Sequence, residues 1–217
     1  MSSSTLINQV QIIKSKLLKS NQYYNVKTTK KKIFLHDTAG ASASSSINWW
    51  NEKPDHIAAP YLIERDGTII EAFDPSYWAY ALGVPGGTDM EKESIHIELC
   101  NYGGLSEMGG KYYIFGNKLN EIPIEKVQLY KVSHRGFKAF EKYTAAQIKS
   151  TILLIDYLCK TFKIKISDVE NFWYFGAKSK GLHSHTTVRK DKSDIHPQPE
   201  LIKAIYDYAG CKAAITE

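Results

Sequence analysis

Ile33-Phe34-Leu35-His36 is a short apolar run that ends in a histidine. A run of this length is typical of a buried strand, which would deliver His36 at its carboxyl end. Residues 94–101 predict a second strand, in which alternation places His96 and Glu98 on one face. Imidazole and carboxyl groups are thus placed on predicted strands.

The residues after the first strand predict a loop, a helix and a hairpin. Residues 40–46 are small and predict a loop, and residues 47–51 predict the start of a helix. Residues 61–73 contain Asp66-Gly67, a dipeptide typical of tight hairpin turns. Residues 103–142 are rich in aromatic side chains and predict an inserted excursion of strands and loops rather than a second domain.

Two helices are predicted in the second half of the chain. Thr144-Ala145-Ala146-Gln147 has the spacing of a capping box, which starts a helix. The predicted apolar face of this helix consists of Ile148, Ile152, Ile155, Cys159 and Phe162. Pro199 at a first turn and Gly210 beyond a last turn predict the other helix, with loop and strand over residues 171–198.

The first 32 residues differ from the rest of the chain in charge. They contain seven lysines and no acidic residue, so their net charge is +7. Because the whole chain has a net charge of +5, residues 33–217 carry −2. An amphipathic helix over residues 5–19 is predicted from the helical spacing of Leu6, Val10, Ile13 and Leu17. We therefore expect a basic N-terminal helix and connector, residues 1–32, ahead of a catalytic domain, residues 33–217. This N-terminal arm is expected to make at most weak contact with anionic surfaces.

The composition is typical of a folded domain. Hydrophobic residues make up 43% and charged residues 24% of the 217 residues. No apolar run is long enough to span a membrane, and the polar N-terminus does not have the pattern of a secretory signal peptide. Cys100, Cys159 and Cys211 are an odd number without paired spacing, which argues against a disulfide framework and favours synthesis in the cytoplasm.

Residues 181–194, Gly-Leu-His-Ser-His-Thr-Thr-Val-Arg-Lys-Asp-Lys-Ser-Asp, gather imidazole, lysine and carboxylate groups. A catalytic zinc site needs three N, O or S ligands and an open position. His36, His185 and Asp194 can supply these ligands, and His183 is the alternative to His185. The other interpretation of the segment is a polar surface loop held by a salt bridge.

Five motifs lie in order between residues 33 and 205. They are Phe34-Leu35-His36-Asp37-Thr38-Ala39, Arg65-Asp66-Gly67-Thr68-Ile69, Trp78-Ala79-Tyr80-Ala81-Leu82-Gly83, Ser94-Ile95-His96-Ile97-Glu98-Leu99, and His185 with Lys192-Ser193-Asp194. Together they resemble the type-2 N-acetylmuramoyl-L-alanine amidases, a family of phage lysis amidases, peptidoglycan-recycling amidases and peptidoglycan recognition proteins. The resemblance implies a mixed α/β fold, in which helices flank a central mixed sheet of about five to six strands with a zinc cleft at one end.

The resemblance also implies roles for five residues. His36, His185 and Asp194 would bind one Zn²⁺ per chain, which makes a hydroxide nucleophile available and polarises the scissile carbonyl. Glu98 would be the general base that passes the water proton to the leaving amine, and Lys192 would stabilise the oxyanion. The implied reaction is zinc-dependent hydrolysis of the amide bond between N-acetylmuramic acid and L-alanine in peptidoglycan.

Four further residues are candidate substrate contacts. Trp50, Trp78 and Tyr80 have rings that can stack on a sugar face or a peptide. His96 stands where the family usually has a tiny residue, so it is expected either behind the metal ligands or facing the substrate.

Within the family, a phage endolysin is the expected function, with release from the cytoplasm to the cell wall. The excursion at residues 103–142 is long for a minimal recycling enzyme. A cytoplasmic recycling amidase is the alternative. Some phage members have a catalytic tyrosine at the position of Ala59, whereas recycling amidases use a glutamate as the base, which Glu98 resembles. A non-catalytic peptidoglycan-binding protein is disfavoured because all three ligand positions hold competent ligands. Nucleic-acid binding is not expected, because no recognition motif is present.

Overall fold

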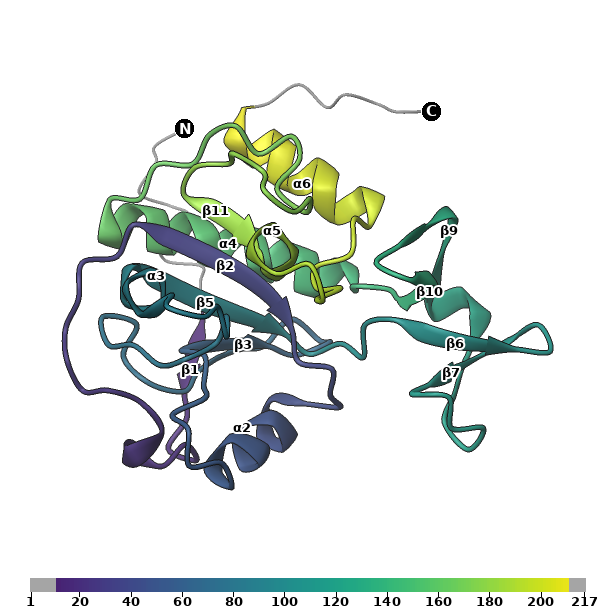
Figure 1. Ribbon diagram of the computed structural model, residues 1–217, viewed down its shortest axis with the longest axis horizontal. Coiled ribbons are helices and arrows are strands. Elements are labelled where there is room, and N and C mark those ends of the chain that lie inside the picture. Colours follow the sequence, from purple (N-terminus) through teal and green to yellow (C-terminus); the bar gives the residue numbers. More distant parts are fainter. Residues whose placement is uncertain (1–10, 211–217) are drawn as a thin grey trace.

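The central feature of the fold is a six-stranded mixed sheet with the strand order β1-β4-β3-β5-β2-β11 (Figure 1). The structure is a computed structural model, and it describes residues 11–210. The strands are β1 (Ile12–Lys14), β2 (Lys32–Asp37), β3 (Tyr61–Ile63), β4 (Ile69–Glu71), β5 (Ser94–Leu99) and β11 (Leu182–Ser184). Only the β3–β4 hairpin in this sheet is antiparallel, and the other neighbours are parallel. The predicted mixed α/β fold is confirmed.

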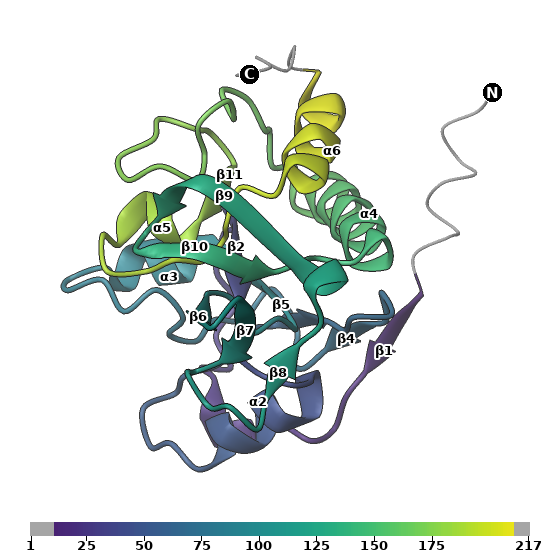
Figure 2. The ribbon, with the colours of Figure 1, turned by 90° about the vertical axis from the view of Figure 1, so that its right-hand side faces the viewer.

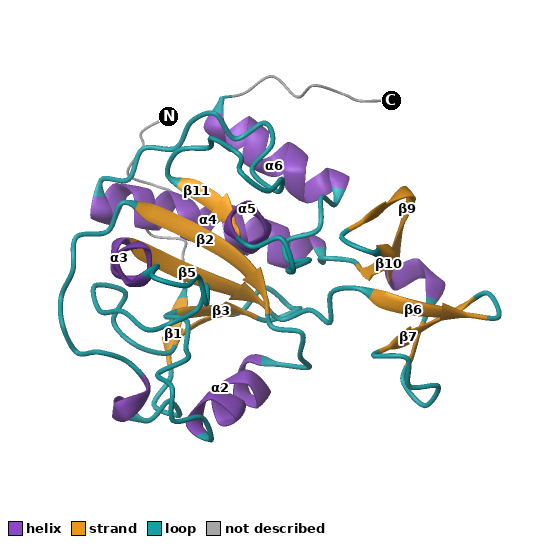
Figure 3. Cartoon of the chain, viewed as in Figure 1, coloured by secondary structure: helices purple, strands orange, loops and turns teal. Residues whose placement is uncertain are grey.

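Helices cover both faces of this sheet. Helices α4 (Ala145–Phe162) and α6 (Pro199–Ala209) lie on one face, and α2 (Ala43–Asn51) lies on the other (Figure 3). From the neighbouring strands β2 and β5, the core under α4 and α6 takes the apolar residues Ile33, Leu35, Ile95, Ile97 and Leu99. Because side chains alternate along a strand, His36, His96 and Glu98 project from the opposite face.

Local hydrogen bonds of the capping residues determine where α4 and α2 begin. Thr144 closes the predicted capping box at α4 by accepting from the Gln147 N–H at 3.0 Å. A second capping box, at Ser42, starts α2 at Ala43, so the helix begins inside the predicted loop. The buried side of α4 is rotated by about one residue from the predicted apolar face and consists of Gln147, Thr151, Leu154, Ile155 and Leu158. Gln147 belongs to it because its amide donates to the carbonyls of Ile63 and Cys100.

The predicted helix over residues 5–19 is wrong for the part that the structure describes. Ile12–Lys14 form β1, an edge strand of the central sheet, which pairs in parallel with β4. Ile13 and Leu17, two members of the expected apolar stripe, are 48% and 57% exposed. Pairing with β4 satisfies backbone groups that a helix would satisfy internally, so the tertiary contact overrides the helical spacing. Leu6 and Val10 lie outside the described residues.

The excursion at residues 103–142 forms two small antiparallel sheets, one of three strands and one of two strands. The first contains β6 (Leu105–Met108), β7 (Lys111–Ile114) and β8 (Glu121–Ile122), and the second pairs β9 (Val127–His134) with β10 (Phe137–Glu141). Both project to one side of the central sheet and face the viewer in Figure 2. The prediction of strands and loops in this segment is confirmed.

Two short helices are adjacent in sequence to strands of the central sheet. Helix α3 (Thr88–Glu93) leads directly into β5, and α5 (His185–Val188) directly follows β11. Between residues 11 and 210 there is no helix with the length and apolar character required to cross a membrane.

Candidate metal and catalytic site

Three potential metal ligands from distant parts of the chain meet at the end of β2. His36 lies on β2, His185 opens α5, and Asp194 lies in the loop that follows. The His185 Nδ1 atom is 3.1 Å from His36 Nδ1 and 3.0 Å from Asp194 Oδ2, and His36 Nδ1 is 3.4 Å from Asp194 Oδ2. All three ligand atoms lie within 4.8 Å of one another. The structure thus brings the three predicted ligand residues together.

The opposite ring nitrogens of both histidines are held by other groups. His185 Nε2–H donates to the Leu82 carbonyl at 2.9 Å, and His36 Nε2 lies 3.0 Å from His96 Nδ1. Both Nδ1 atoms are therefore directed at the cluster. Two imidazoles and one carboxylate, with their outer atoms fixed in this way, fit the ligand set of a catalytic zinc ion.

The electrostatics of the cluster suit a cation. Burial lowers the pKa of His36 to about 3, against the opposing effect of its hydrogen bond with Asp194, so this imidazole is neutral at neutral pH. Burial on its own would raise the pKa of Asp194, but its hydrogen bonds with His185 and His36 hold the pKa well below the usual range. A neutral imidazole and an ionised carboxylate are the forms that bind metal.

Glu98 lies beside His36. The two residues are direct partners in the parallel pairing of β2 with β5, and both line the same cavity. Burial, and then repulsion from Asp194, raise the pKa of Glu98 to about 8, while Lys192 opposes the shift. Within residues 11–210, Glu98 Oε2 has no hydrogen-bond partner. A carboxyl group with this pKa and a free oxygen is suited to proton transfer near neutral pH.

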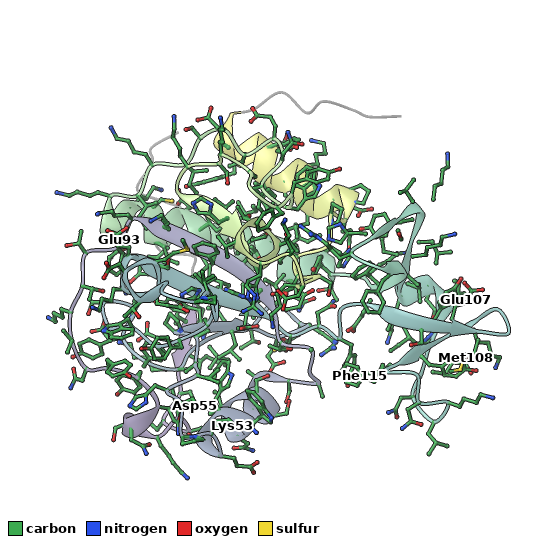
Figure 4. The ribbon with its side chains drawn as sticks, viewed as in Figure 1. Lys53, Asp55, Glu93, Glu107, Met108 and Phe115 are labelled. Atoms are coloured by element: carbon green, nitrogen blue, oxygen red, sulfur yellow. The ribbon has the colours of Figure 1, made fainter. Side chains whose placement is uncertain are left out.

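The cavity has a volume of about 1120 Å³. Its lining includes Ser45, Trp49 and Trp50 from α2 and residues 80–83 from the segment that precedes α3. Lys192 lines the cavity on the same loop as Asp194. Lys53 and Asp55 lie next to the end of α2, whereas Glu107 and Met108 lie at the outer end of the inserted strands (Figure 4).

The predicted substrate contacts divide into two groups. Trp50 and Tyr80 line the cavity, but Trp78 and His96 do not. Trp78 is 8% exposed because its ring stacks on Tyr24 at 4.0 Å, and His96 is 2% exposed because it lies behind His36. Trp78 is therefore not part of the cavity wall, and of the two positions expected for His96 the structure shows the one behind a candidate metal ligand.

Sequence reasoning missed Tyr24 and His56, which line the same cavity. Their rings stack on each other at 4.4 Å. Tyr24 comes from the connector before β2, and its aromatic neighbour Tyr23 was the only local signal of a buried segment. His183, the alternative ligand, lies outside both the cavity and the cluster, and its ring stacks on Phe34 at 4.9 Å.

The inserted β9–β10 hairpin packs on the loop that carries Asp194. The Tyr130 hydroxyl is 2.8 Å from His196 Nδ1, and Phe140 stacks on the same ring at 4.6 Å. The Arg135 guanidinium donates to the carbonyls of Thr186 and Lys190, each at 3.2 Å. These contacts hold both ends of the segment between His185 and His196.

Comparison with known proteins gives a family and a fold. The sequence profile described as N-acetylmuramoyl-L-alanine amidase matches residues 27–199. The structure is similar to that of the N-acetylmuramoyl-L-alanine amidase LysC from Clostridium intestinale URNW, with a TM-score of 0.53, 15% identity, and coverage of 93% of this chain and 99% of that chain. It is similar to a mutant endolysin from Bacillus subtilis, with a TM-score of 0.53, 16% identity, and coverage of 93% and 98%. A search of curated sequences gives no significant match.

Proposed function

The chain belongs to the N-acetylmuramoyl-L-alanine amidase family, and from this membership we propose that it hydrolyses the amide bond between N-acetylmuramic acid and L-alanine in peptidoglycan. The observation that carries the proposal is the meeting of His36, His185 and Asp194 beside Glu98 on one open cavity. A family member that only binds peptidoglycan has no need of this combination of ligand atoms and a proton-transfer group.

His36, His185 and Asp194 are the residues that would hold one zinc ion per chain. When bound, zinc acts as a Lewis acid toward the amide carbonyl and lowers the pKa of water to about 7. The protein contributes a fixed ligand geometry, because Leu82 and His96 hold the outer nitrogens of the two histidines.

Glu98 is proposed as the general base and then the general acid. Its carboxylate takes a proton from the attacking water as oxygen adds to the carbonyl carbon on the muramic acid side. The same proton then passes from Glu98 to the amide nitrogen as the C–N bond breaks, which leaves a carboxylate on the sugar and a free amine on L-alanine. Glu98 is available for both steps because it lines the cavity beside His36 and, within residues 11–210, its Oε2 has no hydrogen-bond partner.

Lys192 and the aromatic wall are proposed to act on the rest of the substrate. The Lys192 ammonium lines the same cavity and would stabilise the negative charge that develops on the carbonyl oxygen. Trp50 and Tyr80, which both line the cavity, would contact the sugar or the stem peptide.

We propose a phage endolysin as the biological setting. The inserted segment at residues 103–142, which adds two small sheets beside the central sheet, favours this over a minimal recycling enzyme. One structural relative is itself described as an endolysin. A cytoplasmic recycling amidase remains the second candidate, because Glu98 resembles its base.

The bond that is cut can be tested with purified peptidoglycan. The zinc-loaded protein should release new amino termini of L-alanine without new reducing sugar ends. New reducing ends would contradict amide cleavage. Binding to peptidoglycan without any new amino termini would instead support the non-catalytic binder. Soluble muropeptides and intact sacculi, compared as substrates, distinguish recycling from lysis.

A further inference from the structure

Glu91 is a buried acid that the proposed reaction does not use. It lies on α3, is 3% exposed, and is not part of the cavity wall. Its carboxylate accepts backbone N–H groups from Ala81 at 3.2 Å, Leu82 at 2.9 Å and Gly83 at 3.3 Å. A charged side chain is rarely buried without such partners, and here they all belong to one turn of chain.

This loop segment, residues 81–83, accepts a hydrogen bond from one of the proposed metal-binding histidines. The Leu82 carbonyl accepts the Nε2–H of His185 at 2.9 Å. With its proton on Nε2, His185 directs the Nδ1 lone pair at the cluster. By fixing the N–H groups of residues 81–83, Glu91 therefore fixes the carbonyl that orients His185.

The same carboxylate reaches the other histidine through His96. Glu91 Oε2 is 3.1 Å from His96 Nε2, an ion-pair distance without the alignment of a regular hydrogen bond. His96 Nδ1 is 3.0 Å from His36 Nε2. If His36 binds metal through Nδ1, its Nε2–H donates to His96 Nδ1, and His96 must then carry its own proton on Nε2, facing the carboxylate.

We propose that Glu91 is a positioning residue that orients both metal-binding histidines at once, His185 through the turn at residues 81–83 and His36 through His96. The inference rests on the proposed zinc site. Groups that hold the outer nitrogen of a ligating histidine fix its tautomer and ring orientation, and their loss typically costs about 10–100-fold in metal affinity. Glu91 is placed to exert this effect on two ligands.

The experiment compares three variants of the full chain. Glu91→Gln keeps the size of the side chain but removes its charge and one acceptor oxygen. His96→Ala interrupts only the branch to His36. The matched control is Asp89→Asn, on the same helix, because the Asp89 side chain is 97% exposed. Zinc affinity is measured by competition with a chromophoric chelator, the ligand geometry by the visible spectrum of the Co²⁺ protein, and the fold by the melting temperature without metal.

We expect Glu91→Gln to lose about 10–100-fold in zinc affinity and to change the Co²⁺ spectrum. His96→Ala should lose less, because the Leu82 branch is intact, and Asp89→Asn should stay within about twofold of the parent. Parental affinity and an unchanged spectrum in Glu91→Gln would overturn the proposal, even with a lowered melting temperature, since Glu91 would then be only structural. If Glu91→Gln does not fold, parental zinc affinity in His96→Ala overturns it. A parent chain that binds no zinc refutes the metal centre itself and this inference with it, whereas zinc binding that none of the variants changes refutes only the inference.

Discussion

His36 and Glu98 are direct register partners across β2 and β5, so a proposed metal ligand and the proposed general base leave the sheet side by side. Paired residues of parallel strands project from the same face. Their spacing is therefore set by the backbone of two buried strands rather than by flexible loops. Rigid elements of this kind hold catalytic groups more precisely than loops do.

Asp194→Ala should lose most of the bound zinc and the hydrolytic activity. The change removes the only carboxylate of the ligand set, so two imidazoles remain. Metal content after gel filtration and release of L-alanine amino termini measure the effect. Asp191→Ala is the control, because Asp191 is a carboxylate of the same loop that lines the cavity but does not belong to the ligand cluster. Full zinc content and full activity in Asp194→Ala would show that the ligand set is wrong.

Glu98→Ala should keep its zinc and its fold but lose turnover by about 10²–10⁴-fold, the usual cost of removing a general base. The metal is retained because Glu98 is not among the three clustered ligand residues. Initial rates on muropeptides and zinc content are measured on the same sample. Turnover near that of the parent would remove Glu98 from the mechanism.

The stability of the metal-free protein should also report the pKa of Glu98. This pKa is raised from 4.5 to about 8, so the folded protein prefers the protonated carboxyl group. The stabilisation from the bound proton is complete below pH 4.5 and is lost as the pH rises through 8. Glu98→Gln stays neutral, so its melting temperature relative to the parent should rise between pH 4.5 and pH 9. A difference that does not vary with pH would contradict the raised pKa.

Tyr130→Phe tests the contact between the inserted hairpin and the Asp194 loop. The change removes the hydroxyl next to Nδ1 of the buried His196 and should destabilise the fold by about 1–3 kcal/mol. Urea unfolding measures the loss. Tyr174→Phe is the control, because the Tyr174 side chain is 56% exposed and its loss of a hydroxyl should be nearly neutral. Equal stability of the two variants would show that the hairpin contact contributes little.

The N-terminal arm offers fewer free charges than its composition suggests. Lys31 and Lys32 both pair with Glu93, and Lys30 is buried with its ammonium on the carbonyls of Tyr77 and Lys92. Replacing Lys16 and Lys27 by glutamine should slow the digestion of sacculi at low salt and leave the rate on soluble muropeptides unchanged.

This electrostatic effect should fade as salt rises, because the Debye length falls from about 30 Å at 0.01 M to about 8 Å at physiological ionic strength. Digestion rates at several salt concentrations measure it. If the digestion rates of sacculi and of soluble muropeptides fall equally at every salt concentration, the result would contradict electrostatic attraction.

Those parts of the fold that depend on neighbouring residues were predictable from the sequence. The strand around His36, the capping box at Thr144 and the hairpin turn at Asp66-Gly67 each have local causes. The three candidate ligands were found because a family motif supplied their long-range association. Periodicity alone would not have placed His185 beside His36.

The errors of prediction concern contacts made at a distance. Ile12–Lys14 join the edge of β4, a partner that hydrophobic spacing does not identify. Trp78 was expected in the groove, yet Tyr24 covers its ring, and a single aromatic residue gives no sign of which face will be covered. Tyr24 itself enters the cavity wall from a connector that has no motif.

The position of β11 at the edge of the sheet has a consequence for the order in which the site is completed. β11 pairs only with β2, and it introduces the segment that contains His185 and Asp194. A chain synthesised only as far as residue 181 contains five of the six strands of the central sheet but, of the three proposed ligands, only His36. The proposed metal site is therefore among the last features that a growing chain can assemble, and fragments cut short before β11 lack two of its three residues.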